Sequence, residues 1–189
     1  MALEHALLVA LSERAGAGID LACRFDRSIG FFWHATHQQI YRVLARMERD
    51  GWVVATEVPQ PQAPPRREYA VSGEGRRVLR DWLSAPTPVE PLRSALAVKL
   101  RGAADGDRAA VLEVVRATRA EHAARLAHYE HLRERDYPDP DALADRELDQ
   151  YLVLLGGLRY ERFWVDWLDD CLRAHARHPT APRPERQPA

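Results

Sequence analysis

The stretch THQQIYRVLARMERDG, residues 36–51, decides the fold of the first half of the chain. Thr36 and Gln39 have the spacing of a capping box, in which the threonine oxygen accepts a backbone N–H and the glutamine side chain reaches back. With Gly51 as a stop signal, the stretch predicts a helix from His37 to about Asp50. At about 100° per residue, its apolar and polar residues separate onto opposite faces. The apolar face carries Ile40, Val43, Leu44 and Met47, the polar face carries Gln38, Arg42, Ala45 and Arg49, and Tyr41 and Arg46 flank the polar face.

The segments on both sides of this helix predict a winged helix-turn-helix. Leucines at positions 3, 7, 8 and 11 have helical spacing and indicate a first helix, which residues 16–18, Gly-Ala-Gly, end. A second short helix stops near residues 28–30. Residues 52–58 and 67–71 are strand-like and predict a two-stranded hairpin across a proline-rich loop. Ser72 then caps a fourth helix. In the winged variant of the helix-turn-helix, the third helix enters the major groove of DNA and the hairpin lies on the DNA backbone.

The second half of the chain predicts helices only. A short helix carries Leu92, Leu96 and Leu100, a long one runs from Asp107 to about Arg135, and the last runs from Asp141 to about Arg177. The two long helices reach roughly 45–50 Å at 1.5 Å per residue, so they need a partner surface.

Proline clusters mark the connections, because an internal proline removes a helix hydrogen bond. The predicted fold class is therefore mainly α. It has a winged helix-turn-helix DNA-binding domain with a two-stranded wing at residues 1–85 and an all-helical dimerisation domain at residues 86–178. Residues 179–189 hold four prolines and little to bury, and predict a disordered tail.

Composition indicates an ordinary globular protein. The 189 residues are 46% hydrophobic and 29% charged, and no run is long and apolar enough for a membrane helix, so a cytoplasmic protein without membrane contact is expected. Two cysteines, Cys23 and Cys171, lie far apart in the sequence and exclude a disulfide framework. A net charge of -1 excludes a histone-like polyelectrolyte, but residues 34–80 hold eight arginines against five acidic residues.

The polar face of the third helix fits the recognition of bases. Glutamine can make two hydrogen bonds to adenine and arginine two to guanine, while Arg66 and Arg67, expected at the hairpin tip, could neutralise phosphates. The predicted partner is double-stranded DNA. The predicted DNA-binding residues are Thr36, His37, Gln38, Gln39, Tyr41, Arg42, Arg46, Arg49, Arg66 and Arg67. The alternatives are a solvated helix face, and a helical protein–protein interaction module that never touches DNA.

The last helix is the expected dimer contact, because its apolar and aromatic residues cannot all face one neighbour within the chain. The residues expected in a homodimer interface are Leu152, Leu155, Phe163, Trp164, Trp167, Leu168 and Cys171. The alternative is that this cluster closes a monomeric core. Gly156 and Gly157 allow a second helix to approach, or equally mark a kink.

An enzyme is not expected. The sequence has no Gly-x-Ser-x-Gly elbow, no phosphate-binding glycine-rich loop and no His-Glu-x-x-His motif. His128 and His131 lie one turn apart, but no matching ligands complete a metal site, so neither a metal nor a cofactor is predicted.

Several stretches resemble the PadR-type transcriptional regulators. They are residues 3–8, 18–21, 32–41, 44–51 and 69–76, and residues 160–168 resemble the last helix of members with a larger C-terminal domain. The resemblance implies a bacterial winged-helix repressor that dimerises through its C-terminal helices and is often relieved by a small molecule. We predict a repressor that reads an inverted repeat.

A small aromatic effector is expected between the two domains, because Tyr151, Tyr160, Trp164 and Trp167 have few polar partners nearby. A tightly packed interface without a cavity is the equal alternative.

Overall fold

A computed structural model describes residues 3–26, 35–60, 63–89 and 93–178. The chain forms two compact units, residues 1–90 and 91–189. The predicted tail, the predicted end of the second helix near residues 28–30, and Leu92 lie outside the described residues.

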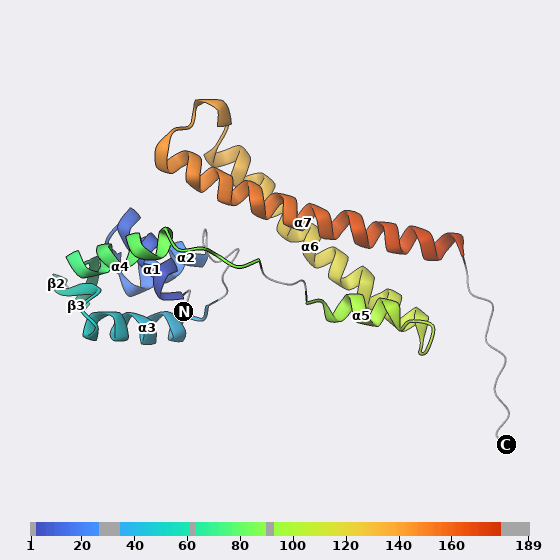
Figure 1. Cartoon of the computed structure of the whole chain (residues 1–189), viewed down its shortest axis with the longest axis horizontal. Coiled ribbons are helices and arrows are strands. Elements are labelled where there is room, and N and C mark those ends of the chain that lie inside the picture. Colours follow the sequence, from blue (N-terminus) through green and yellow to red (C-terminus); the bar gives the residue numbers. More distant parts are fainter. Residues whose placement is uncertain (1–2, 27–34, 61–62, 90–92, 179–189) are drawn as a thin grey trace, which may run out of the picture. The chain divides into compact units, whose positions relative to one another are not determined.

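The first unit combines four helices with a small antiparallel sheet among its described residues (Figure 1). The elements are α1 (Leu3–Glu13), β1 (Gly16–Ala17), α2 (Gly18–Asp26), α3 (His37–Arg49), β2 (Val53–Gln60), β3 (Ala63–Val71) and α4 (Gly73–Leu83). The order is that of a winged helix-turn-helix, with β2 and β3 as the wing. Its core contains apolar residues of α1, α2, α3 and the sheet, among them Leu8, Leu21, Leu44 and Val53.

The sheet has three strands in the order β1-β3-β2, where the sequence predicted two. The additional strand is Gly16–Ala17, which the sequence indicated only as the end of the first helix. Gly16 pairs with Tyr69 and Ala17 with Glu68. The segment is extended and lies beside β3, so pairing satisfies backbone groups that a loop buried there would leave without partners.

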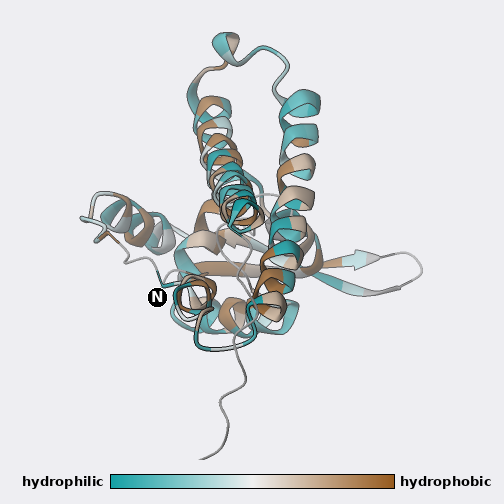
Figure 2. Cartoon of the chain, turned by 90° about the vertical axis from the view of Figure 1, so that its right-hand side faces the viewer, coloured by the Kyte–Doolittle hydropathy of each residue, from teal (hydrophilic) through white to brown (hydrophobic). Residues whose placement is uncertain are grey.

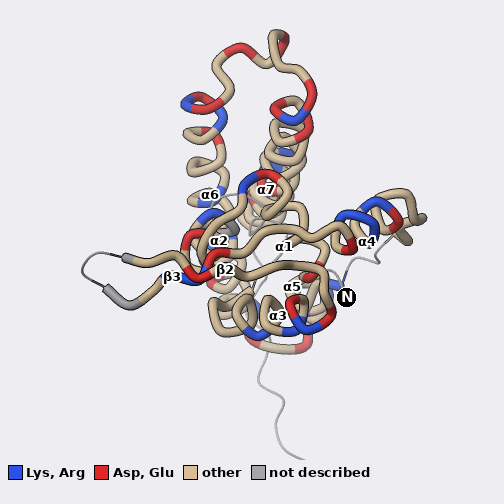
Figure 3. The backbone as a smooth tube through the Cα atoms, turned by 90° about the vertical axis from the view of Figure 1, so that its left-hand side faces the viewer, with Lys and Arg blue, Asp and Glu red and all other residues tan. Residues whose placement is uncertain are grey.

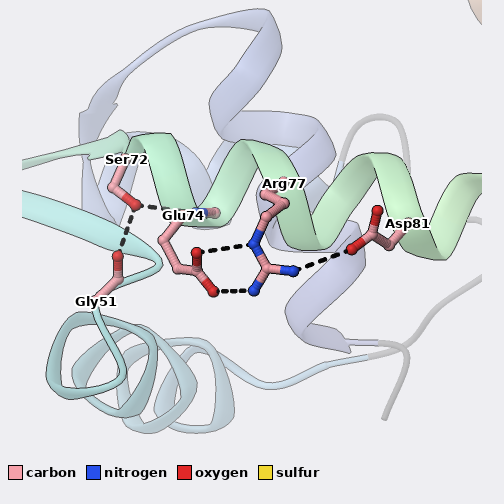
Figure 4. A network of polar contacts seen from close by, with 6 residues as sticks. Gly51, Ser72, Glu74, Arg77 and Asp81 are labelled. Atoms are coloured by element: carbon pink, nitrogen blue, oxygen red, sulfur yellow. Dashed lines mark hydrogen bonds and ion pairs between the residues drawn. The ribbon is translucent and has the colours of Figure 1, made fainter.

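Ser72 joins the end of α3 to the start of α4 (Figure 4). Its hydroxyl accepts a hydrogen bond from the backbone N–H of Gly75 at 2.9 Å and donates one to the carbonyl of Gly51 at 2.6 Å. Gly51 has a φ of 75°, a left-handed conformation that favours glycine and ends α3. A Cβ at Gly75 would lie 2.0 Å from the carbonyl oxygen of Trp52, so glycine lets α4 begin against that turn.

The second unit contains α5 (Ala95–Arg101), α6 (Arg108–Asp136), a short 3₁₀ helix at Pro140–Ala142 and α7 (Asp145–Arg177). The last helix begins at Asp145, not at Asp141 as the sequence predicted. Residues 140–142 form the 3₁₀ turn, and Leu143 has extended backbone angles that no α-helix can pass through. Within α7, Gly156 and Gly157 do not break the helix, which is continuous to Arg177.

The helices α6 and α7 pack against each other along the second unit. Val115 of α6 forms a buried cluster with Trp164 and Leu168 of α7. Arg119 also holds Asp169 through two hydrogen bonds of 3.0 Å, so a polar clamp joins the same two helices. Hydrophobic colouring runs along both helices in Figure 2. No described helix is long and apolar enough to cross a membrane.

Candidate DNA-binding surface

The start of α3 is held by the predicted capping box. The backbone N–H of Gln39 donates to the Thr36 hydroxyl at 3.2 Å, and the Thr36 N–H donates to Oε1 of Gln39 at 2.8 Å. The two side chains are exposed but already engaged. Gln39 therefore cannot offer its carbonyl oxygen to an adenine without breaking the box. These two predicted DNA-binding residues set the helix start.

The inward face of α3 is the one that the sequence predicted. Ile40, Leu44 and Met47 are fully buried in the core of the first unit. His37, Gln38, Arg42 and the other predicted DNA-binding residues of the helix are exposed. The apolar stripe therefore orients the helix, and its polar face points to solvent.

Gln38 and Arg42 lie one turn apart on that outward face. Among the described residues, neither side chain makes a hydrogen bond or an ion pair. Arg49 donates to the carbonyl of Ala45 on its own helix at 3.4 Å, a weak contact. These side chains can therefore bind a ligand without first giving up a strong interaction.

Tyr41 stands at the edge of the same face and is 43% exposed. Its ring lies against Gly18, where a Cβ would approach Tyr41 Cε1 to 2.4 Å. Glycine at the start of α2 therefore lets the tyrosine ring pack closely. This contact positions Tyr41 at the border between α2 and α3.

Arg46, which the sequence predicted as a DNA-binding residue, already has a partner within the protein. Its guanidinium forms an ion pair with Glu4 of α1, and the Glu4 side chain is only 14% exposed. Because these residues lie 42 positions apart, only the tertiary structure reveals the pair. Arg46 fastens α3 to α1 in the free protein.

The prediction that Arg66 and Arg67 lie at the hairpin tip is wrong. Both belong to β3, where Arg66 pairs with Val58 and Arg67 with Glu57 in the strand register. Strand pairing extends beyond them to Gln60 and Ala63, because the prolines of this segment continue β3. In Figure 3 the charged residues lie near the base of the hairpin.

Both wing arginines also have acidic partners. Arg66 contacts Asp20 of α2 at 3.1 Å and Glu68 at 2.6 Å. The hydrogen bond to Glu68 is the main cause that raises the pKa of Arg66 above its ordinary value. Arg67 contacts Glu48 of α3 at 2.7 Å and lies 5.9 Å from the centre of the Tyr69 ring. The Arg67–Glu48 pair joins the wing to α3.

The residues predicted for a dimer interface fall into three groups: buried, exposed and half-buried. Trp164 and Leu168 are 6% and 0% exposed within one chain, so they belong to the core between α6 and α7 and have no surface for a partner. Leu152 and Phe163 are each 51% exposed, and Phe163 stacks on Trp167 at 6.3 Å. Leu155, Trp167 and Cys171 are half-buried.

A buried polar cluster in the second unit was missed by the sequence analysis. Nδ1 of His122 lies 2.5 Å from Oε2 of Glu161, and Nε of Arg125 donates to Oε1 of the same carboxylate at 3.1 Å. The His122 ring stacks on Trp164 at 4.9 Å, and the Trp164 indole N–H is buried without a partner among the described residues. The sequence signal that could have revealed this cluster is Glu161, a single acidic residue among the apolar residues on the buried face of α7.

No group of metal-ligating side chains occurs among the described residues. His128 and His131 are exposed positions on α6.

Two family models match the chain. "Transcriptional regulator PadR-like family" matches residues 7–81 and "Virulence activator alpha C-term" matches residues 92–176. The probable transcriptional regulator Rv1176c of Mycobacterium tuberculosis is 48% identical over 184 residues, which cover 92% of this chain and 97% of that protein.

Solved structures share the fold. The virulence activator AphA of Vibrio cholerae has a TM-score of 0.78 and 28% identity, and the match covers 93% of this chain and 98% of AphA. PadR of Bacillus subtilis in complex with operator DNA has a TM-score of 0.80 and 23% identity, over 92% of this chain and 99% of PadR. That PadR is described as a negative transcriptional regulator and has also been solved with p-coumaric acid. With a winged helix-turn-helix, a helical second unit and a relative 48% identical over nearly its whole length, the chain belongs to the PadR-like family of transcriptional regulators.

Proposed function

We propose that two copies of this chain form a homodimer that binds an inverted-repeat operator, with one α3 in the major groove of each half-site, and represses transcription. The observation that carries the proposal is the outward face of α3, on which Gln38 and Arg42 are exposed and without partners among the described residues. Glutamine and arginine make bidentate contacts to adenine and guanine in the major groove. The B. subtilis PadR complex with operator DNA supports this use of the fold.

In this proposal the remaining basic residues contact the phosphates of the DNA backbone. The capped start of α3 presents backbone N–H groups and a positive dipole end next to His37. Arg66 and Arg67 are exposed enough to exchange their carboxylate partners for phosphates when the wing approaches the backbone. Arg46 would leave behind Glu4, whose side chain is only 14% exposed and would lose its partner, so we assign Arg46 a weaker role.

The dimer contact in this proposal is the face of α7 that points away from α6. At about 100° per residue, Leu152, Gly156, Phe163 and Trp167 fall within about 60° of each other. Leu152, Gly156 and Phe163 are exposed and Trp167 is half-buried. An apolar row at the surface marks an interaction site. Gly156 has no side chain to keep a second helix away.

Regulation by a small aromatic molecule is the last part of the proposal. B. subtilis PadR has been solved with p-coumaric acid, and the exposed aromatic side chains of α7 include Tyr160. A ligand releases the operator only if it binds the DNA-incompetent geometry more tightly. The relatives include a negative regulator and a virulence activator, so the sign of regulation needs its own test. Operator binding also implies a cytoplasmic protein.

Selection from a library of random duplexes tests DNA binding. We expect enrichment of an inverted repeat with half-site centres about one helical turn, 10–10.5 bp, or a multiple apart. Fluorescence anisotropy should give an affinity that falls with salt on any duplex and is higher on the selected one. Absence of both enrichment and salt-dependent binding would favour a helical interaction module. A reporter gene placed behind the selected site then gives the sign of regulation.

A further inference from the structure

A groove of about 660 Å³ lies between the first turns of α6 and the last turns of α7. Its apolar lining consists of Ala109 and Leu112 from α6 and Leu172 and Ala176 from α7. The two helices diverge toward this end of the second unit in Figure 1. Small-molecule sites commonly have volumes of about 300–1,000 Å³, so the groove is large enough for a ligand.

The floor of the groove continues the core of the second unit. Leu172 packs against the buried cluster of Val115, Trp164 and Leu168. An apolar molecule lying on Leu172 would extend an existing core and remove further apolar surface from water. Trp164 belongs to this cluster and Trp167 packs against it, so tryptophan fluorescence should respond when a ligand occupies the groove.

Each charged or titratable side chain that lines the groove is basic. They are Arg108, Arg116, Arg173, His175 and His178, and no acidic residue is found among the described lining residues. Guanidinium groups bind carboxylates with strong, directional hydrogen bonds. An apolar floor with a rim of a single charge sign complements a molecule with an apolar body and one anionic head.

Two of these arginines already contact acids on their own helices. Nη1 of Arg116 lies 2.5 Å from Glu113, and Nη2 of Arg173 lies 2.6 Å from Asp170. The four side chains are between 53% and 73% exposed, and such surface pairs stabilise a protein little. Each of these contacts uses one nitrogen of a guanidinium that has several donors, so a carboxylate ligand can be bound as well.

We infer that this groove is a binding site for an aliphatic carboxylate, with the chain on Leu112 and Leu172 and the carboxylate at Arg116 and Arg173. The described lining has leucine and alanine but no Phe, Tyr or Trp on which an aromatic ligand would stack. The site lies entirely in the second unit. It is separate from the aromatic effector proposed above, and its test does not depend on DNA binding.

Titration of the full chain with decanoate, below its micelle concentration, tests the inference by calorimetry and tryptophan fluorescence. We expect saturable one-site binding, at least about tenfold weaker in an Arg116→Gln/Arg173→Gln variant. Decylamine, which has the same chain and a cationic head, should bind weakly. Arg135→Gln is the matched control, because Arg135 also contacts an acid on its own helix, Asp136, but does not line the groove.

Ala176→Trp tests the location, because it fills the groove without removing a charge. It should abolish decanoate binding while circular dichroism and thermal unfolding stay those of the folded protein. Three results would overturn the inference: no binding to the wild-type chain, unchanged binding to Ala176→Trp, or equal binding of decylamine. A change of oligomeric state in Ala176→Trp, measured by sedimentation, would assign the groove to a second copy of the chain instead.

Discussion

His122 and Glu161 meet in the interior of the second unit, with Nδ1 of the imidazole 2.5 Å from Oε2 of the carboxylate. Glu161 is 5% exposed and receives a second contact from Arg125. Its charge also contributes to the pKa of Tyr129, which is raised first by burial and then by Glu161. One carboxylate of α7 is therefore surrounded by three side chains of α6, which favours one register of the two helices.

Glu161→Ala should lower the free energy of unfolding by about 2–3 kcal/mol, because it leaves the buried His122 without its acidic partner. Urea unfolding followed by circular dichroism measures the change. Glu130→Ala is the matched control, since Glu130 contacts Arg162 across the same helices but at the surface. Its loss should stay below about 1 kcal/mol. Equal losses in the two variants would contradict a special role of the buried cluster.

Gly75→Ala should be strongly destabilising, because the new Cβ would lie 2.0 Å from the Trp52 carbonyl oxygen. The turn between α3 and β2 would have to move, at a cost of about 2–4 kcal/mol. Gly73→Ala, two residues earlier, meets nothing within 4 Å and should be neutral or stabilising by up to about 1 kcal/mol. Thermal unfolding of both variants makes the comparison, and similar melting temperatures would refute the close approach.

Gln38→Ala and Arg42→Ala should each cost about 1–3 kcal/mol on a selected operator and relax its sequence preference. Arg67→Ala should weaken binding to all duplexes alike and flatten the salt dependence by about one unit. Anisotropy on operator and random DNA separates the two effects. If all three variants lost affinity equally on both duplexes, the division into base-reading and phosphate-binding residues would be wrong.

Glu48→Gln should strengthen DNA binding, in contrast to Arg67→Ala. It removes the acid that holds Arg67 at 2.7 Å and takes a negative charge from the recognition helix. Affinity for random DNA should therefore rise, and the salt dependence should steepen by about one unit. Asp50→Asn, at the exposed end of the same helix, is the control for a general change in charge. An equal rise in both variants would show that the Arg67 contact does not restrain DNA binding.

Phe163→Asp should convert a dimer into a folded monomer, because Phe163 lies on the exposed face of α7 and outside the intrachain core. A charge buried between two apolar helices without a partner is costly. Sedimentation measures the mass, and circular dichroism checks the fold. Glu147→Arg, an exposed change about 170° around the same helix from this face, should leave the dimer intact. A dimeric Phe163→Asp variant would remove this face from the interface.

Acid should weaken the clamp between Arg119 and Asp169. The hydrogen bonds from Arg119 are the main reason that the pKa of Asp169 lies below its ordinary value of 3.8. A carboxylate with a lowered pKa in the folded state stabilises above the unfolded pKa, and this contribution is lost as the pH falls through the folded value. Asp169→Asn should therefore be less stable than wild type near neutral pH, and the difference should shrink below 3.8. Urea unfolding across this range measures it, with Asp166→Asn as the control.

Local sequence signals were sufficient to predict the bounds and the buried face of α3. The capping box of Thr36 and Gln39, the stop at Gly51 and the spacing of Ile40, Leu44 and Met47 depend on residues within a few turns of each other. Such signals determine where a helix begins, where it ends and which face is buried, since the geometry of one helix sets all three. The order of helices and wing followed from the same kind of pattern.

Only the tertiary structure decided which partners the arginines take and which aromatic residues face inward. Arg46 finds Glu4 and Arg67 finds Glu48 across different elements, and no local pattern specifies such pairs. Along α7, apolar residues occur on both faces, so the sequence could not separate buried Trp164 from exposed Phe163. A helix with two apolar faces has no unique inward side until a neighbour packs against it, and here the neighbour is α6.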